Sequence, residues 1–302
     1  MNVRTLAAAL LAGLLTTSGA LAQAETFDLR ATDDYKPVAG DRVRVEQTER
    51  QKSNVVVKNG PQVLQQQEGQ EGFVATYDEE VLAVDDEGEV TRARRTYEAF
   101  RDLETAQDAE VKGLTVLLER SAEGKHTFAA EGDATIPPPL KARLDDEATK
   151  KDAKAEGGED DEDRQEALMP EAPVEVGATW DVPPEQAMEA FGFEETELAD
   201  EGSSVKGTLV SVDERDGQRF LKVQVAIDLA FKRFQGLPCP EPATFKMQLE
   251  LELPAGGTSP AGEARLSGTF DGKPTVPNAP PGVTMDVDLE VENHQRRVRT
   301  GG

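Results

Sequence analysis

The chain is poor in the residues that most often carry metal binding and nucleophilic catalysis. Its 302 residues include one cysteine, Cys239, and two histidines, His126 and His294. Zinc sites and Cys–His pairs need several such side chains together, so the composition argues against both. The sequence contains neither a Ca²⁺-binding EF-hand loop nor a phosphate-binding glycine loop. We therefore expect no metal, no cofactor and no identifiable catalytic residue.

Aromatic residues are also scarce, at 5% of the chain, and Trp180 is the single tryptophan. This scarcity argues against a sugar-stacking cleft. It also argues against the aromatic girdles of an outer-membrane β-barrel, an alternative that strand patterning alone would allow. We expect Trp180 to be a core anchor where the second half of the chain begins, or alternatively an aromatic that faces a ligand.

Positive charge is in short supply, with 33 Lys and Arg against 59 Asp and Glu, a net charge of −26. Such a chain repels nucleic acids and anionic headgroups, so we expect no nucleic-acid partner. Much of the excess is local, because Asp145 to Arg164 holds ten acidic and four basic residues. A cationic protein partner would suit this charge, although a solvated acidic surface is the simpler interpretation.

One long apolar run occurs, and it lies at the N-terminus. Arg4 precedes the run from Leu6 to Leu15, and Ala22-Gln23-Ala24 supplies the small-x-small cleavage pattern. The run is shorter than the roughly 20 residues that span a bilayer. We predict a signal peptide over residues 1–24, export to the periplasm or the extracellular space, and no transmembrane segment after cleavage.

What the chain does contain is apolar and polar alternation with a period of two. Apolar residues occupy every second position from Leu221 to Phe231, and the pattern recurs within Thr244–Leu253 and Thr284–Val298. Side chains alternate across a strand, so each segment buries one face and exposes the other. The pattern is typical of antiparallel sheets with one solvated face. It predicts a mainly β fold of antiparallel curved sheets, half-barrel or sandwich-like, with a few short helices.

Composition divides the chain into regions. Residues 25–136 form a β-rich N-terminal half, and residues 171–302 form a β-rich C-terminal half. Between them, residues 137–170 are an acidic linker, with a weak helix from 140 to about 150 and disorder predicted from about 151 to 165.

Three segments leave their local structure open or weakly defined. Gln62 to Gln70 fits either a strand or a polar loop, and Val90 to Phe100 fits either a strand or one face of a helix. The prolines around Cys239 predict a loop there. The Asp216-Gly217 turn, by contrast, is a strong hairpin signal between two alternating strands.

One stretch resembles a known group of proteins. Pro173 to Trp180 reads Pro-Val-x-x-Gly-x-x-Trp, Leu168-Met169-Pro170 precedes it, and Val84 to Gly88 forms a Val-Asp-x-x-Gly hairpin. These motifs resemble uncharacterised exported bacterial β-rich proteins, which are distantly similar to the half-barrels of periplasmic lipoprotein carriers. The resemblance implies a concave apolar face able to hold a lipid or acyl chain, and it transfers no catalytic residues.

The sequence thus favours an exported, non-catalytic binding or interaction protein that holds an apolar ligand or a protein partner. If an apolar ligand binds on a concave sheet face, the later strands and the tryptophan supply the contacts: Trp180, Val223, Val225, Ile227, Leu249 and Leu251. The same aliphatic residues would equally fill a closed core. The alternative from another class is a hydrolase with remote carboxylates, which a chain of 59 acids neither identifies nor excludes.

Overall fold

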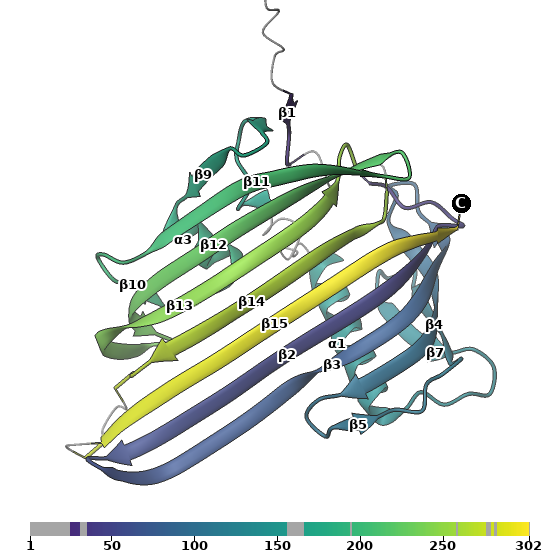
Figure 1. Cartoon of the computed structure of the whole chain (residues 1–302). Coiled ribbons are helices and arrows are strands. Elements are labelled where there is room, and N and C mark those ends of the chain that lie inside the picture. The colour runs from purple at the N-terminus through teal and green to yellow at the C-terminus, as the bar shows by residue number, and fades with distance from the viewer. Residues whose placement is uncertain are drawn as a thin grey trace, which may run out of the picture.

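The computed structural model describes residues 25–30, 35–155, 166–193, 195–257, 259–275, 279–280 and 283–301. The predicted signal peptide and residues 156–165 of the acidic tract lie outside this part of the chain. The described residues are dominated by one large antiparallel sheet that is curved and open (Figure 1). The predicted fold class is confirmed.

The main path of the sheet runs in the order β7-β6-β4-β3-β2-β15-β14-β13-β12-β11-β9. The N-terminal half supplies β2 (Arg42–Asn59), β3 (Gln62–Val84), β4 (Val90–Asp102), β6 (Thr115–Arg120) and β7 (His126–Ala130). The C-terminal half supplies β9 (Thr179–Val182), β11 (Ser204–Arg215), β12 (Gln218–Phe234), β13 (Leu237–Pro254), β14 (Gly262–Gly272) and β15 (Val283–Gly301). Short strands β5 (Gln107–Asp108) and β10 (Glu197–Leu198) pair with β4 and β12, while β1 (Thr26–Phe27) pairs with β8 (Val174–Glu175).

The two halves meet along the pairing of β15 with β2. The antiparallel register runs from Val283 opposite Asn59 to Gly301 opposite Arg42. Lys52 and Lys58 of β2 form ion pairs with Glu290 and Asp286 of β15 across this seam. The two β-rich halves predicted from composition therefore share one continuous sheet.

The long strands follow from uninterrupted alternation. In β12 the side chains of Val223, Val225, Ile227 and Leu229 are buried, while Gln224 and Ala226 between them are exposed. A shift of one residue in register would bury the polar set, so the alternation fixes which side of the strand faces the core.

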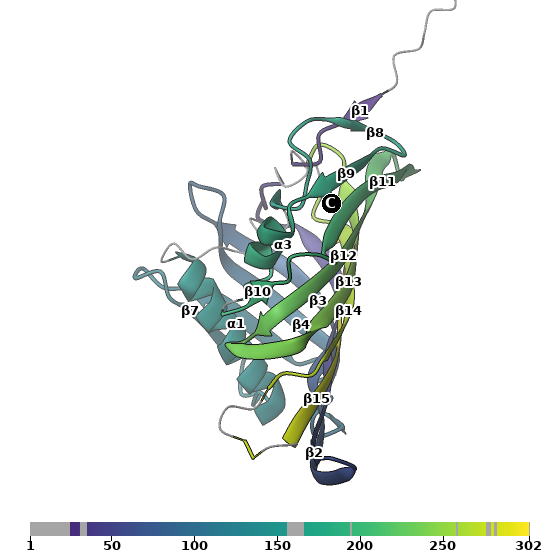
Figure 2. The same cartoon turned by 90° about the vertical axis from the view of Figure 1, so that its left-hand side faces the viewer.

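Two helices cover the inner side of the curved sheet, as Figure 2 shows. Helix α1 (Pro138–Ala155) packs on the N-terminal half through Leu140 and Leu144, which are fully buried. Helix α3 (Pro184–Ala190) packs on the C-terminal half through Ala187 and Ala190. Among the described residues, no helix combines the length and the apolar character needed to cross a bilayer.

Each half has its own hydrophobic cluster on the inner side. The N-terminal cluster is centred on Val45, Phe73, Tyr77 and Tyr97 beneath α1. The larger C-terminal cluster contains the inner face of β12 and β13 and continues into the segment that covers them. The sheet therefore has two covered regions, with the strands of the seam between them.

The structure decides the two segments whose secondary structure the sequence left ambiguous, and it corrects two other expectations. Gln62–Gln70 and Val90–Phe100 both lie in strands. The loop expected around Cys239 is wrong: β13 begins at Leu237, and the Cys239 side chain is buried. The helix predicted to end near residue 150 continues to Ala155, because buried contacts with the sheet outweigh its weak apolar periodicity.

Candidate functional site

The aliphatic residues predicted to bind a ligand lie in the C-terminal core. Val223, Val225, Ile227, Leu249 and Leu251 are each at most 5% exposed. They share one cluster with Leu29, Leu168 and Met169, and with Ala187 and Ala190 of α3. The inner face of β12 and β13 is therefore covered in this structure, and a ligand would reach these five side chains only if the cover moved.

Trp180 lies at the edge of the same cluster. Its indole Nε1 donates a hydrogen bond to the carbonyl oxygen of Leu168 at 2.9 Å. Its ring lies so close to Gly207 that a Cβ added there would come within 2.0 Å of the ring. Trp180 thus connects the segment around Leu168, which covers the C-terminal cluster, to β11. A large aromatic side chain that joins two packed segments in this way is a core anchor.

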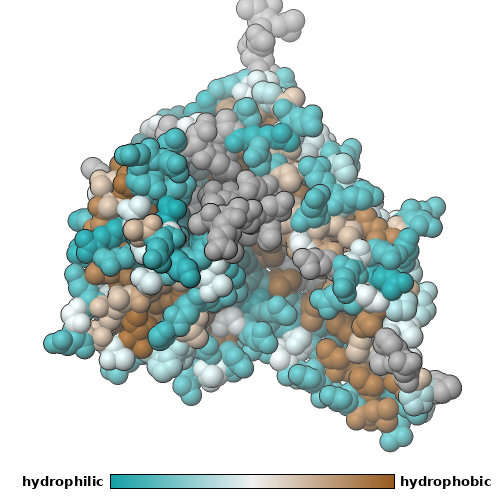
Figure 3. Space-filling model, turned by 180° about the vertical axis from the view of Figure 1, so that it is seen from behind, coloured by the Kyte–Doolittle hydropathy of each residue, from teal (hydrophilic) through white to brown (hydrophobic). Residues whose placement is uncertain are grey.

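The inner face is only half-buried along the second part of β2 and the first part of β15, beyond the residues that α1 covers, and we place the candidate site there. Val55 of β2 pairs with Val287 of β15, and Val57 pairs with Met285. These side chains are half-buried, and Leu289 continues the row toward the covered core. We call this set the open apolar face: Val55, Val57, Met285, Val287 and Leu289. Figure 3 shows apolar surface over this end of β2, β3 and β15.

The two sides of the seam strands differ sharply in charge. On the outer side, Asp286, Asp288 and Glu290 of β15 contact Lys58, Asn54 and Lys52 of β2. On the inner side, residues 53–57 of β2 and 285–289 of β15 hold the open apolar face and the uncharged Ser53, whereas charged inner residues such as Glu49 and Arg297 lie further along these strands. Apart from Val56, the outer positions of this stretch are polar or charged, so its apolar residues lie mainly on the inner side although they are only half-buried there.

The open apolar face is bordered by two uncharged glutamines on β3. Gln65 pairs with Val57 and Gln67 pairs with Val55, and both glutamines are exposed. Amide side chains both donate and accept hydrogen bonds without carrying charge. Viewed from the helix side, the molecular surface is hollowed between the part under α1 and the C-terminal part, as seen in Figure 3.

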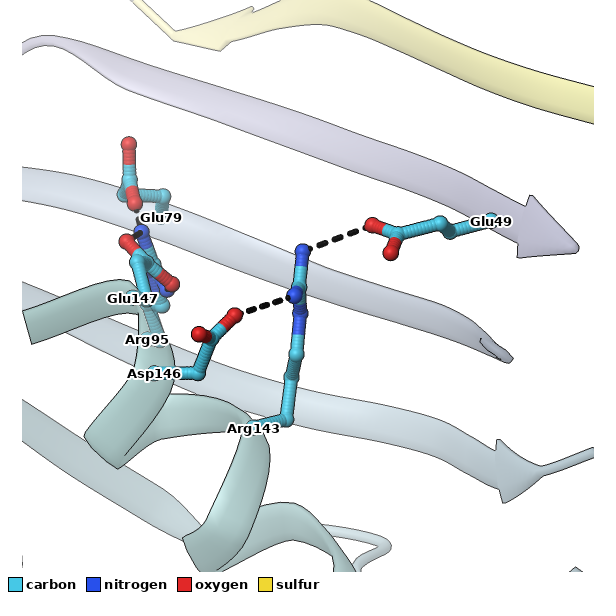
Figure 4. Close-up of polar contacts among 6 residues, drawn as sticks. All are labelled: Glu49, Glu79, Arg95, Arg143, Asp146 and Glu147. Atoms are coloured by element: carbon cyan, nitrogen blue, oxygen red, sulfur yellow. Dashed lines mark hydrogen bonds and ion pairs between the residues drawn. The ribbon is translucent and has the colours of Figure 1, made fainter. Parts of the chain in front are cut away.

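An ion-pair network centred on the buried Arg95 lies beneath α1 (Figure 4). The Arg95 guanidinium on β4 donates to Glu79 of β3 at 2.6 Å and to both carboxylate oxygens of Glu147 on α1 at 2.7 and 2.8 Å. Arg143 of α1 reaches Glu49 of β2 at 2.8 Å. These contacts fasten the helix to three strands.

Electrostatics in this network favour the charged forms. Burial opposes ionisation of Glu147, but the nearby Arg95 guanidinium outweighs it and lowers the pKa of Glu147 to about 2. Burial also opposes ionisation of Glu79, whose pKa Arg95 lowers below its usual range. Because both carboxylates are ionised and hydrogen-bonded to Arg95, neither is suited to general acid–base catalysis at neutral pH.

Histidine and cysteine serve local packing. The His126 ring lies 2.9 Å from Asp152 of α1, and the His294 ring lies 3.0 Å from Glu263. Burial raises the pKa of the Cys239 thiol, which keeps it in its unreactive form. Within the described ranges, no three of the His, Cys, Asp and Glu side chains come together as a metal site.

Two cavities lie away from the open apolar face. One, of about 500 Å³, crosses β2, β15, β14, β13 and β12, and charged side chains that pair with one another line it, among them Lys52 with Glu290 and Lys246 with Asp228. The other, of about 670 Å³, lies at the end of β15 beside Arg296 and Arg299. Neither contains the residues predicted from sequence, apart from Ile227 in the first.

Sequence patterning found the strands of the open apolar face but not its exposure. Met285, Val287 and Leu289 alternate with acids, so the sequence shows that they share one side of the strand. How far other segments cover that side depends on the path of distant parts of the chain. The Arg95 network was also missed. Its signal is that Arg95 shares the parity of Ala93 and Tyr97, both buried, so a charge occupies an inward position of β4.

Comparison with known proteins adds little to this description. No protein-family model and no curated protein matches the sequence. Among solved structures, the crystal structure of an outer membrane channel from Pseudomonas putida F1 is 8% identical, covers 88% of this chain and 98% of that chain, and has a TM-score of 0.18. A likeness this weak carries no argument, so the β-rich fold is shown by the structure itself and the resemblance to exported bacterial proteins stays a prediction.

Proposed function

We propose that this protein is an exported, non-catalytic binding protein that holds the alkyl chain of a neutral amphiphile on the open apolar face. The observation that carries the proposal is the one-sided character of the seam strands. Over residues 53–57 of β2 and 285–289 of β15 the inner side is apolar and half-buried, whereas the outer side carries ion pairs such as Lys58 with Asp286. Contiguous exposed apolar surface marks binding sites in soluble proteins.

The flanking chemistry favours a neutral ligand over an anionic one. Gln65 and Gln67 offer uncharged hydrogen-bonding groups beside the apolar residues. The net charge of −26 and the acids on the outer side of β15 disfavour a free carboxylate or phosphate headgroup. An alkyl chain along Val55, Val287 and Leu289 with a neutral polar end near the glutamines fits both features.

Adjacent valines of β2 provide a matched test. Val55→Glu places a charge on the open apolar face, whereas Val56→Glu places the same charge on the outer side, where Val56 pairs with Asp286. We expect titration with a fluorescent monoacylglycerol to show binding to the parent chain and to Val56→Glu. Val55→Glu should lose at least tenfold in affinity. Equal affinity in the two variants would exclude this face as the site.

Native mass spectrometry of the chain purified without detergent gives an independent reading. A bound mass that organic solvent extracts, and that is lost in Val55→Glu but kept in Val56→Glu, would support the proposal. A clean apo mass together with no binding of the monoacylglycerol would overturn it and would favour a protein partner for the acidic surface.

A further inference from the structure

The outer edge of β3 is unpaired along its first half. Strand β4 pairs with β3 only from Phe73 onward, and Leu103 donates to the carbonyl of Gly72 at the point where pairing stops. From Gln62 to Gly72, none of the described strands lies against this edge. All residues from Gln62 to Glu71 are exposed. This stretch, residues 62–72, is called the open edge below.

The direction of the free backbone groups can be assigned. Val81 exchanges backbone hydrogen bonds with Gly40 and Asp41 on the β2 side, whereas the Gly72 carbonyl accepts from Leu103 on the β4 side. Backbone groups alternate between the two edges along a strand, and the β2–β3 register is unbroken from Gln65 to Glu80. The amides and carbonyls of Gln66, Glu68 and Gln70 therefore face outward.

The open edge lacks the usual protection against pairing. Natural edge strands are blunted by Lys, Pro, short length or a covering element. Residues 62–72 contain no Lys, Arg or Pro. The terminal strands of the sheet differ, since β9 has four residues and β7 has five and contacts α1. The β2–β3 register shifts near Leu64, so the regular part of the edge runs from Gln65 to Glu71; it carries two acids and no base, and an exposed edge of this kind is suited to addition of a further strand.

We propose that a second copy of this chain pairs with the open edge, antiparallel and two-fold symmetric about Gln67. Centring the axis on Gln67 overlaps residues 65–69 with themselves, within the part of β3 whose register with β2 is unbroken, and leaves the Gly72 carbonyl with Leu103. The register then places each Glu68 opposite a Gln66, so no like charges face each other in this overlap. Centring it one residue later would set Glu68 against Glu68, which is destabilising.

The side chains support the same register. Within one chain the Gln66 amide already donates to the Glu68 carboxylate at 2.9 Å. In the symmetric pair, each Gln66 faces a Glu68 of the second copy, so the same donor and acceptor types meet twice across the interface. The inner face of β3 then continues into the inner face of β3 in the second copy. The two open apolar faces lie on either side of the glutamines at this interface.

Disulfide trapping tests the axis directly. In a Cys239→Ala parent, Gln67→Cys places two thiols opposite each other at a position that does not share ladder hydrogen bonds, where Cα atoms lie about 4.5 Å apart. Gln65→Cys is the matched control: it lies on the same strand and the same face, but its two copies would be offset by four residues, or about 13 Å. That distance is too long for a disulfide.

We expect mild oxidation to cross-link Gln67→Cys into a covalent dimer at least tenfold faster than Gln65→Cys. Equal rates would indicate random collision and would overturn the proposal. Sedimentation of the parent over a concentration series should show a monomer–dimer equilibrium. Gln66→Pro, which removes an outward N–H without breaking the β2 ladder, should shift it at least tenfold toward monomer.

Salt gives a further reading, because two strongly acidic copies repel each other and added salt screens this repulsion. The dimer fraction should rise with salt. A chain that stays monomeric at every concentration and salt level would overturn the proposal and would leave the edge to a heterologous extended peptide. A dimer that Gln66→Pro leaves intact would place the interface elsewhere and would equally overturn it.

Discussion

The inner face of the sheet has two regions with the same sequence pattern and different environments. In β12 and β13, alternating aliphatic residues lie under α3 and the segment around Leu168, and they are almost inaccessible to water. In the first part of β15 and the second part of β2, alternating aliphatic residues are only half-buried, and Val287 and Leu289 lie at the margin of the C-terminal cluster. Alternation thus defines which side is apolar, whereas the cover decides whether that side is core or surface.

The largest effect is expected where the cover is complete. Phe231 is fully buried and its ring lies 5.5 Å from Phe193 and 5.8 Å from Phe234. Phe231→Ala should lower the free energy of unfolding by about 4 kcal/mol, because it removes a large side chain and leaves a cavity. Val287→Ala on the open apolar face should lower it by about 1 kcal/mol or less. Chemical denaturation of both variants measures the contrast, and similar losses would mean that the two regions are equally covered.

The attachment of α1 should give the next effect. Arg95 is 7% exposed and is hydrogen-bonded to Glu79 and Glu147. Arg95→Met leaves two half-buried carboxylates without their cation, so we expect a loss of about 3 kcal/mol. Arg44→Met, at an exposed ion pair with Glu98, should cost about 0–1 kcal/mol. Equal losses in the two variants, measured by urea denaturation, would argue against a buried network beneath α1.

The contact of the covering segment with β11 predicts a smaller effect. Gly207→Ala would drive a Cβ into the Trp180 ring, and overpacking of this kind costs about 2 kcal/mol. Trp180 is the single tryptophan, so displacement of its ring should also change the intrinsic fluorescence. In Gly268→Ala the nearest atoms to the added Cβ are at 3.3 and 3.4 Å, so stability should change less and the fluorescence should stay as in the parent.

The pH dependence of the free energy of unfolding tests the ion pair between Glu147 of α1 and Arg95. The folded-state pKa of Glu147 is about 2, below its unfolded value near 4.5, so its contribution is present above pH 4.5 and is lost as the pH falls toward 2. Glu147→Gln removes this proton linkage. Over that pH range, the stability of the parent should fall more steeply than that of the variant, by up to about 1.4 kcal/mol per pH unit. Parallel curves would show that Glu147 is not ionised against Arg95.

Much of the fold could be predicted from local sequence patterns. Whether a given strand could be predicted depended on whether its own residues fitted only one kind of secondary structure. The strands around Val225 and Val287 were predicted because a period of two needs no knowledge of distant residues. At Val90–Phe100 the sequence does not decide between a strand and a helix, because Tyr97, Phe100 and Leu103 also fit a helical spacing. Pairing of β4 with β3 and β6 decided it.

The candidate site was harder to predict for the same reason. The aliphatic residues first expected to contact a ligand, such as Val223 and Leu249, are the most regular in the sequence, and they lie in the covered core. The open apolar face involves Val55 and Val287, which are far apart in the chain and meet only through the β15–β2 pairing. No local pattern reports on a pairing between the first long strand and the last.

The sequence by itself determined that the chain forms amphipathic antiparallel strands, which face of each strand is apolar, and where its acids gather. It did so because strand periodicity and charge are local properties. Tertiary structure alone decided that the two halves form one sheet, that α1 is held by Arg95, and that residues 62–72 form an unpaired edge. These features depend on which distant segments pack together, and packing is governed by the burial and hydrogen bonding available in the complete fold.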